Sequence, residues 1–360
     1  GNNRTNAYFP YSQDYAAGWS NLGSTGINAT ALVDRFITWE KQATTNIGLD
    51  FGFFKNRITG SIEYYKRASK DLIMGTALPP SGGMGFSEIT TNIGAMENTG
   101  FEINLNTVNF RNDNFEWTTN INVGTNKNKI TKLNGAENII SGMNILEVGT
   151  DRYEFYTWEY AGVDPTDGAA MWYKDDANGN KVTTKNYSEA TRYKQGKSAL
   201  ADFEGGFTNY FRYKNFDLNV LFNFSVGSYI YDSTYAGLMN TGASAGYQWS
   251  QDIANRWQNP GDITNTPKLT TAQNNYTSTS TRFLFKNDYL RLKALNLGYN
   301  FSDKVVSQMG IKGLRIYFQG DNLLTFQSHK GIDPEQSIGG TTDSRSYQQR
   351  IYTVGFNVKL

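Results

Sequence analysis

The sequence offers few side chains that could carry out covalent chemistry. Its lone histidine is His329, and cysteine is absent. A Ser-His-Asp hydrolase would need that histidine beside a nucleophilic serine, but no G-x-S-x-G motif accompanies it. The lack of cysteine excludes disulfides, thiolate catalysis and cysteine metal sites. We therefore predict no catalytic residues, no enzyme activity and no cofactor, with His329 an ordinary loop residue. Metal-free carboxylate chemistry stays open, although no pair of acids stands out.

One acidic stretch has a faint likeness to a calcium-binding loop. It spans 174–180 and reads KDDANGN. The pattern D-x-[DN]-x-[DN]-G would require an acid at position 174, where Lys174 stands. An Asn-Gly hairpin turn accounts for the same residues. We predict no metal site here, and Asp176 and Asn178 would be the first candidates if a metal did bind.

Four aromatic residues in long predicted loops are candidates for substrate binding. Aromatic side chains present flat apolar faces, which can stack on sugar rings. The four are Trp172, Tyr173, Trp249 and Trp257. The alternative is that these side chains pack the loops against one another or against a partner.

The elements that would position these residues are strands of alternating character. In the final strand, Tyr352, Val354, Phe356 and Val358 alternate with polar residues or glycine. Successive side chains of a strand point to opposite faces, so one face is apolar and the other polar. The pattern recurs in strand after strand, with almost no helix to cover the apolar face. A sheet that is apolar outside and polar inside is typical of an outer-membrane β-barrel.

Tight turns join the predicted strands on one side, and long connections join them on the other. Turns are expected at 55–56, 111–114 and 214–215, and a short helix within 302–313. The long connections cover 71–96, 128–204, 228–281 and 323–346. Short periplasmic turns and long extracellular loops are characteristic of outer-membrane barrels, with the C-terminus on the short-turn side.

Some local details follow from the same alternation. Within 289–301 the apolar residues change from even to odd positions, and a bulge near Ala294 would restore the register. Alternatively, the upper part of this strand stands above the membrane. Residues 31–39 could form a short helix. Trp117 is expected to face lipid. The polar residues expected on the inner face are Asp50, Glu63, Glu102, Asn104, Asn106, Asn120, Asn122, Asp217, Asn219, Arg315 and Gln319.

The composition agrees with this arrangement and excludes others. The 360 residues include 34 Lys+Arg and 33 Asp+Glu, so the net charge is +1. That balance argues against a nucleic-acid partner, which would favour a basic patch. The mean hydropathy is −0.55, and no apolar run approaches the roughly 20 residues of a membrane-spanning helix. Aromatic residues make up 14% of the chain, as the aromatic girdles of a barrel require.

Several segments resemble the C-terminal half of the SusC/RagA-like, TonB-linked outer-membrane transporters. Each segment is short, but their order and spacing together are specific, and the resemblance covers about residues 39–360. The segments are NIGLDFG at 46–52 with NRITG at 56–60, NIGAMENTGFE at 92–102, YAGVDP at 160–165, GGF at 205–207 with YKNF at 213–216, YLRLK at 289–293 with LGY at 297–299, DNLLTF at 321–326, and GIDPE at 331–335.

The resemblance implies an architecture and a domain organisation. The family's barrel has about 22 strands, and this chain would supply about 9–10 antiparallel strands of it. Residues 1–41 are expected to form a loop or a poorly defined first strand. Residues 42–360 would be the C-terminal part of the barrel, with 128–204 and 228–281 as extracellular excursions. The family's plug domain is expected to be absent from this chain.

The resemblance also implies a function. The chain would belong to a TonB-dependent importer of oligosaccharides or peptides in the outer membrane of a Gram-negative cell. Its partners would be a SusD-like surface lipoprotein, outer-membrane lipid and the TonB complex, reached through the N-terminal part. An alternative is a SusC-like barrel that serves as a structural subunit of an outer-membrane secretion or assembly complex.

Overall fold

The computed structural model describes residues 9–78, 85–135, 137–242, 246, 248–272, 274–335, 338–342 and 346–360. Nine long strands dominate the fold. They are β4 (Lys41–Phe53), β5 (Ile58–Ala77), β6 (Glu88–Arg111), β7 (Phe115–Thr125), β16 (Phe203–Tyr213), β17 (Phe216–Val226), β20 (Tyr289–Asn300), β21 (Gly313–Gln327) and β23 (Ile351–Lys359). Their hydrogen-bonded order is β23-β21-β20-β17-β16-β7-β6-β5-β4. The expected all-β, antiparallel class is therefore confirmed.

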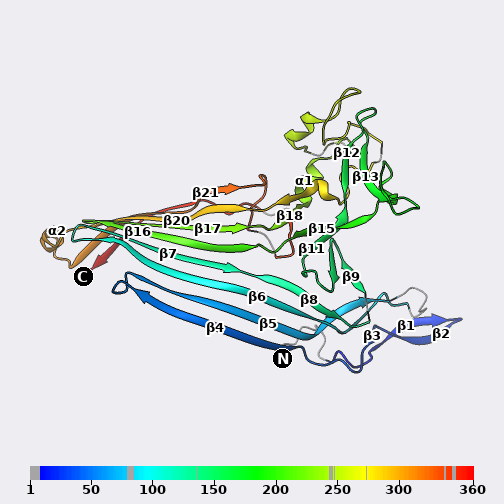
Figure 1. The fold of residues 1–360 in the computed structure, drawn as a ribbon, viewed down its shortest axis with the longest axis horizontal. Helices are drawn as coiled ribbons and strands as arrows, with labels where there is room; N and C mark the ends of the chain where they lie inside the picture. Colours follow the sequence, from blue (N-terminus) through cyan, green and yellow to red (C-terminus); the bar gives the residue numbers. More distant parts are fainter. Residues whose placement is uncertain are drawn as a thin grey trace. The chain divides into compact units, whose positions relative to one another are not determined.

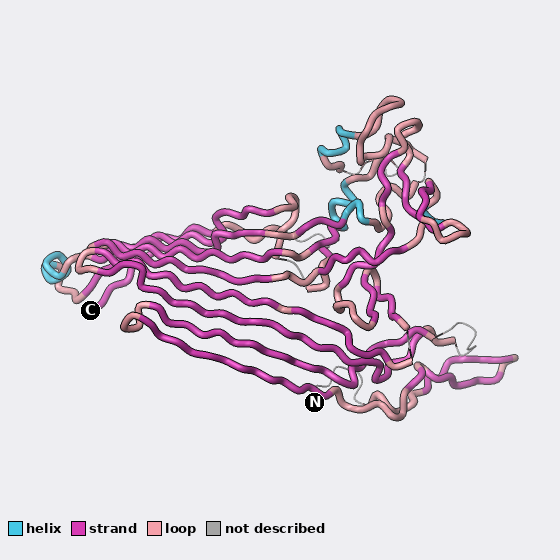
Figure 2. Tube along the Cα trace, viewed as in Figure 1, coloured by secondary structure: helices cyan, strands magenta, loops and turns pink. Residues whose placement is uncertain are grey.

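The remaining elements are short. The short strands are β1 (Tyr15–Asn21), β2 (Ser24–Ala29), β3 (Leu32–Val33), β8 (Lys127–Leu133), β9 (Asn138–Ser141), β10 (Asn144–Glu147), β11 (Glu154–Trp158), β12 (Tyr160–Val163), β13 (Ala170–Asp175), β14 (Lys181–Thr184), β15 (Arg192–Ser198), β18 (Tyr229–Asp232), β19 (Leu284–Lys286) and β22 (Thr341–Thr342). The helices are α1 (Ser233–Leu238) and α2 (Asp303–Gln308), with 3₁₀ turns η2 (Tyr187–Glu189), η3 (Gln251–Asn255) and η4 (Thr281–Phe283). Figure 2 shows how little of the trace is helical. Among the described residues, no helix has the length and apolar character needed to cross a membrane.

The contacts divide the chain into two units. Unit 1 comprises Gly1–Ile47, Tyr64–Gly100 and Lys127–Arg152, and unit 2 comprises Gly48–Glu63, Phe101–Asn126 and Tyr153–Leu360. In unit 2, each strand pairs antiparallel with the next in the order β7, β16, β17, β20, β21 and β23 (Figure 1). The expected short helix is α2, and it lies at the same end of unit 2 as the C-terminus (Figure 1).

One face of the unit 2 strands carries exposed apolar side chains. Val354 and Phe356 of β23 are 76% and 72% exposed, and both lie on the face predicted to contact lipid. Other members of this face are Phe101, Ile103, Trp117, Phe203, Phe216, Leu297 and Ile316. A soluble sheet would bury such rows in its core. Their exposure is what strands that face hydrocarbon require.

The register change in β20 is a bulge. On one side β20 pairs with β21, and the pairing shifts between Leu292 and Ala294. On the other side its pairing with β17 shifts between Leu221 and Phe222. Relative to β17, Lys293 is the extra residue, so the apolar residues stay on one face above and below it. Relative to β21, Lys293 stands opposite two residues, Asn322 and Leu323. The predicted bulge near Ala294 is thereby confirmed.

Two sequence-based expectations on unit 1 are wrong. Residues 31–39 do not form a helix, because Leu32–Val33 pairs as β3 in parallel with β6. Much of the expected 71–96 connection is strand, since β5 continues to Ala77 and β6 begins at Glu88. The rest of that connection includes 79–84, which lie outside the described residues. Burial stabilises these extensions: Leu72 and Ile93 are 7% and 1% exposed, and Ile130 and Ile145 of the same unit are also buried.

The 128–204 excursion contains small sheets. Strand-like behaviour was expected at 153–162 and 169–173, and β11, β12 and β13 occupy these places. The expected Asn178-Gly179 turn joins β13 to β14, with Gly179 at a φ of +79°. A positive φ favours glycine, which explains the residue at this position.

Candidate functional site

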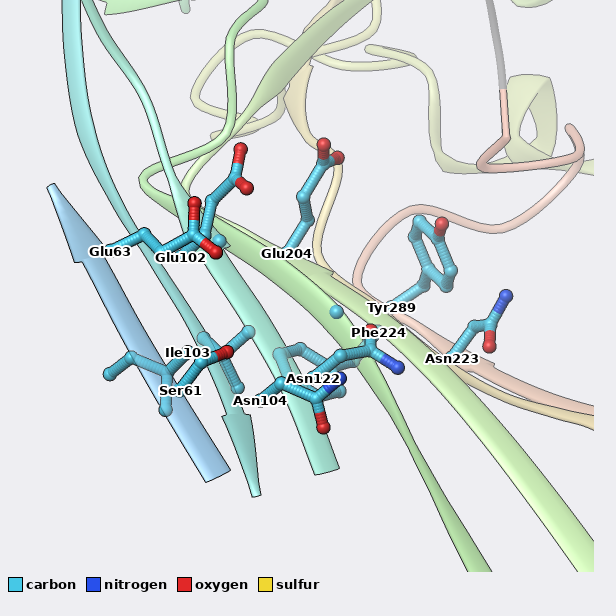
Figure 3. Close-up of a pocket in the computed structure, with 13 residues that line it drawn as sticks. Ser61, Glu63, Glu102, Ile103, Asn104, Asn122, Glu204, Asn223, Phe224 and Tyr289 are labelled. Atoms are coloured by element: carbon cyan, nitrogen blue, oxygen red, sulfur yellow. The ribbon is translucent and has the colours of Figure 1, made fainter. Parts of the chain in front are cut away.

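A hollow of about 570 Å³ lies on the polar face of the unit 2 strands. Six neighbouring strands contribute to it, namely β5, β6, β7, β16, β17 and β20. Its main polar lining residues are Ser61, Glu63, Glu102, Asn104, Asn122, Glu204, Asn223 and Tyr289. Figure 3 shows these side chains projecting from the strands toward the same space. Four of the residues expected on the inner face, Glu63, Glu102, Asn104 and Asn122, are brought together here.

The strand register explains why these side chains converge. Asn104 of β6 lies opposite Asn122 of β7, and Asn122 lies opposite Gly206 of β16. Gly206 in turn lies opposite Asn223 of β17. Residues directly opposite one another in an antiparallel sheet point to the same face. The alternation within each strand therefore builds one continuous polar surface.

The upper part of the hollow is acidic. Figure 3 shows the carboxylates of Glu63 and Glu102 close together, with Glu204 beyond them and the amides of Asn104 and Asn122 below. Among the described residues, no ion pair involves Glu102 or Glu204. Carboxylates and amides offer acceptors and donors to water and to polar solutes, without any catalytic group beside them. The arrangement suits a wet lining better than a reaction centre.

A ladder of asparagines continues this surface between β6 and β7. Asn120 Nδ2 donates to Asn106 Oδ1 at 2.7 Å and to Asn104 Oδ1 at 3.2 Å. Each strand alternates asparagine with apolar residues, so the amides meet across the strand pair. The predicted inner-face positions of these asparagines agree with their contacts.

A charged network crosses β17, β20 and β21 near the tight turns. Arg315 Nη2 lies 2.5 Å from Asp217 Oδ2 and donates to Asn296 Oδ1 at 2.6 Å. The Arg315 side chain passes over Gly298, where an added Cβ would meet Nη2 at 2.3 Å. Asn300 Nδ2 donates to Asp217 Oδ1 at 2.7 Å. Glycine at 298 is therefore what lets Arg315 reach Asp217 two strands away.

An ion-pair cluster that sequence reasoning missed joins β20 to the segment after β21. Arg291 Nη2 lies 2.9 Å from both carboxylate oxygens of Asp333, and the two side chains are 1% and 4% exposed. Glu335 lies 3.0 Å from both Arg291 Nη1 and Lys293 Nζ. The available signal was the pairing of basic YLRLK with acidic GIDPE, two segments already singled out for their resemblance.

The lone histidine holds two loops together. His329 Nε2 lies 2.8 Å from Asp232 Oδ2, and the ring stacks on Phe285 at 3.8 Å between centroids. Asp232 is 1% exposed and also caps α1 by accepting from Tyr235 N. Its carboxylate is thus occupied by local structure. These contacts give His329 a structural role, and its assignment as an ordinary loop residue stays a prediction.

The structure separates the four candidate aromatic residues. Trp172 is 2% exposed and packs edge-on against Tyr160 and Tyr187. A buried ring cannot stack on a sugar, so Trp172 as a substrate contact is wrong in this structure, and loop packing, the stated alternative, describes it. Its Nε1 is buried without a hydrogen-bond partner among the described residues.

The other three aromatics occupy different environments. The Tyr173 ring is half-buried beneath the Lys181 ammonium, which lies 4.6 Å from its centroid. Trp257 is half-buried against Gly168, and its Nε1 donates to Pro165 O at 3.0 Å. Trp249 is 43% exposed. No ring contact between any two of the four occurs in the described part of the chain. Trp249 is the member of this set best placed to meet a solute.

The acidic stretch at 174–180 is a hydrogen-bonded turn. Asp176 Oδ1 accepts from Asn178 N and Asn180 N, each at 2.8 Å. Bonding to the charged form, chiefly by Asn180 N, lowers the pKa of Asp176 from its ordinary value. The turn accounts for Asp176 and Asn178 without a metal. Across the described ranges, no group of three or more His, Asp or Glu side chains is placed to hold a metal ion.

Comparisons with known proteins bear on the whole chain. No family model matches it. TonB-dependent receptor P3 of Formosa agariphila is 30% identical over 96% of this chain. TonB-dependent receptor SusC of Bacteroides thetaiotaomicron is 30% identical over 90% of it. The chain spans only 37% and 32% of these two relatives.

Solved structures give the same picture. The RagAB peptide transporter matches with a TM-score of 0.84 and 28% identity, covering 98% of this chain and 39% of that chain. RagAB in an "open-open" state matches with a TM-score of 0.82 and 26% identity, over 98% of this chain and 38% of that one. These relatives are named as receptors and transporters, not as enzymes. The resemblance to the SusC/RagA-like, TonB-linked outer-membrane transporters is thereby confirmed over nearly the whole chain, which forms part of a β-barrel in the outer membrane of a Gram-negative cell.

Proposed function

We propose that the protein takes up a nutrient through the outer membrane as a SusC-like, TonB-dependent importer. The observation that carries this proposal is the division of the unit 2 strands into an exposed apolar face and a polar face that holds the acidic hollow. Lipid would contact the first face, and solute and water the second. The similarity to the RagAB peptide importer supports the inward direction of transport.

The proposed mechanism is physical and forms no covalent bonds. This chain would be the C-terminal part of the barrel wall, with 128–204 and 228–281 as extracellular excursions. A SusD-like lipoprotein would cover the extracellular side, and energy would come from the TonB complex through a plug domain. The solute would be an oligosaccharide or a peptide, the latter because RagAB is a peptide transporter. Trp249 is the loop aromatic we propose for contact with it, because its ring is exposed.

Uptake by a deletion strain tests this proposal. Cells that lack the protein should fail to grow on one class of oligosaccharide or peptide, and the full-length gene should restore growth. Affinity purification of the tagged protein from outer membranes should recover a surface lipoprotein. Unchanged growth on every such nutrient, together with purification of the protein without a lipoprotein, would refute the importer.

A further inference from the structure

A second hollow in unit 2, of about 770 Å³, shares no lining residue with the first. It lies between the upper parts of β20 and β21 and the segment that leads into β23. Its lining residues include Arg291, Asn322, Lys330, Asp333, Tyr347 and Arg350.

The charge of this lining is positive. Three cations, Arg291, Lys330 and Arg350, face one carboxylate, that of Asp333. Asp333 is bound by both of its oxygens to Arg291. Glu335 lies beside both Arg291 and Lys293, so these two cations and two carboxylates balance one another. Lys330 and Arg350 are exposed, and no ion pair involves either of them within the ranges that the structure describes. The hollow therefore carries two cations that are available to an anion.

Two buried polar atoms at the hollow lack hydrogen-bond partners among the described residues. One is Asn322 Oδ1, an acceptor, and the other is Arg291 Nη1, a donor. Arg291 is 1% exposed, and its Nη1 lies 3.0 Å from Glu335 Oε1 without the alignment of a hydrogen bond. Buried polar groups are nearly always satisfied, so each exception calls for a ligand or water. Both atoms belong to residues that line the same hollow.

We propose that this hollow binds a carboxylate group of the transported solute. Lys330 and Arg350 attract the carboxylate, and Arg291 Nη1 donates to it. Asn322 Oδ1 accepts from a hydroxyl or amide of the same solute. The inference rests on the proposed importer function and adds to it a preference for acidic solutes. Carboxylates of this kind occur in uronic-acid oligosaccharides and in acidic peptides, and the experiment below distinguishes the two sources.

Calorimetric titration of the intact protein, purified from outer membranes with any lipoprotein that accompanies it, measures this preference. The probes are a galacturonic-acid trisaccharide against its neutral galactose counterpart, and a Glu-containing tripeptide against its Gln counterpart. At low salt, one acidic probe should bind at least about tenfold more tightly than its neutral counterpart. Higher salt should reduce this difference, because exposed charges are screened.

Charge-removing variants connect the preference to the hollow. The double variant Lys330→Gln, Arg350→Gln should remove the preference by weakening the acidic probe to the affinity of its neutral counterpart. Lys304→Gln is the matched control, because Lys304 is an exposed cation on α2 outside the hollow. Asn322→Gly permits the positive φ of +55° at this position and removes the acceptor, so it should weaken the acidic probe about fivefold.

Equal affinities for acidic and neutral probes, or an acidic preference that survives the double variant, would overturn the inference. Growth assays separate this failure from failure of the importer. A protein that supports growth on neutral nutrients alone remains an importer without the proposed carboxylate site. A protein that supports no uptake at all fails as an importer, whatever the calorimetry shows.

Discussion

At the scale of single residues, Gly298 shows how a missing side chain permits a long contact. Arg315 crosses above this glycine to reach Asp217. Any Cβ at position 298 would occupy the space of the guanidinium. Glycine is therefore required at position 298 because the Arg315 side chain passes over it, and not because of its own backbone angles.

Gly298→Ala should destabilise the folded protein by about 1–3 kcal/mol, because the methyl group displaces Arg315 and leaves Asp217 without its cation. Gly124→Ala in β7 is the matched control, since its Cβ would meet nothing within 4 Å, and it should change stability by less than about 1 kcal/mol. Denaturant unfolding in detergent measures both. Equal effects of the two alanines would show that Arg315 moves aside without loss.

A second cluster at this scale lies in the turn between β12 and β13. Lys185 Nζ lies 2.6 Å from Asp164 Oδ2 and 2.9 Å from Asp167 Oδ2. The hydrogen bond from Lys185 is the main cause that holds the pKa values of Asp164 and Asp167 below their ordinary range. The same contacts raise the pKa of Lys185.

The direction of these pKa shifts predicts the pH range over which the ion pairs stabilise the turn. Groups with lowered pKa values stabilise the fold above about pH 4 and lose that contribution as the pH falls further, while Lys185 contributes until its own raised pKa is passed. Lys185→Gln should make the turn loosen at higher pH than in the wild type. Trp257 donates a hydrogen bond to Pro165 in this turn. Its fluorescence, obtained by subtracting the spectrum of a Trp257→Phe variant, therefore reports the loosening. Superimposable acid titrations of wild type and Lys185→Gln would count against the cluster.

At the scale of elements, alternation in the sequence predicts the membrane strands well. β16, β17 and β23 alternate regularly, and the tight turn at 214–215 fixes the register of β16 against β17. Because one face of each strand meets hydrocarbon and the other meets water, apolar and polar residues must alternate along it, so the pattern is visible in each strand alone. Even the bulge in β20 could be predicted, because it restores an interrupted alternation.

The parts that could not be predicted depend on partners distant in the sequence. β5 and β6 extend beyond the alternating residues because Leu72 and Ile93 are buried in unit 1. Trp172 becomes a core residue through Tyr160 and Tyr187, and nothing in its local sequence indicates which loops would cover it. Asp333 finds Arg291 across 42 positions. The expected polar face was therefore accessible to sequence reasoning, whereas the second hollow was not.

The β20 bulge predicts opposite results for deletion and substitution of one residue. Deleting Lys293 should force β20 out of register with β17 or β21, because a one-residue shift exchanges the faces of every following side chain. Lys293→Ala keeps the extra residue and loses only the contacts to Glu335 and Gln348. Heat-modifiable migration of outer-membrane fractions should show folded protein for the substitution and little for the deletion. Comparable folding of both variants would mean that the bulge is not needed.

At the scale of the whole molecule, the assignment of faces rests on which side of the strands meets lipid. Val354 and Thr353 are neighbours in the middle of β23 and point to opposite faces. Val354→Lys should cost about 2–4 kcal/mol if that side chain lies near the centre of the hydrocarbon. Thr353→Lys should be tolerated within about 1 kcal/mol, because its face meets water. Unfolding midpoints in lipid vesicles measure the difference, and a larger loss at Thr353 would reverse the assignment of faces.

The extra residue in β20 has a practical consequence for mapping this protein. Below Lys293, odd positions such as Leu295 and Leu297 share the apolar face, whereas above it the odd positions Tyr289 and Arg291 line the two hollows. Because these 360 residues contain no native thiol, single cysteines introduced one at a time along β20 can be labelled without background from this chain. The periodic reactivity toward a water-soluble maleimide should reverse its phase at position 293. The rule that odd positions of β20 face lipid therefore holds only from the tight turn up to that residue.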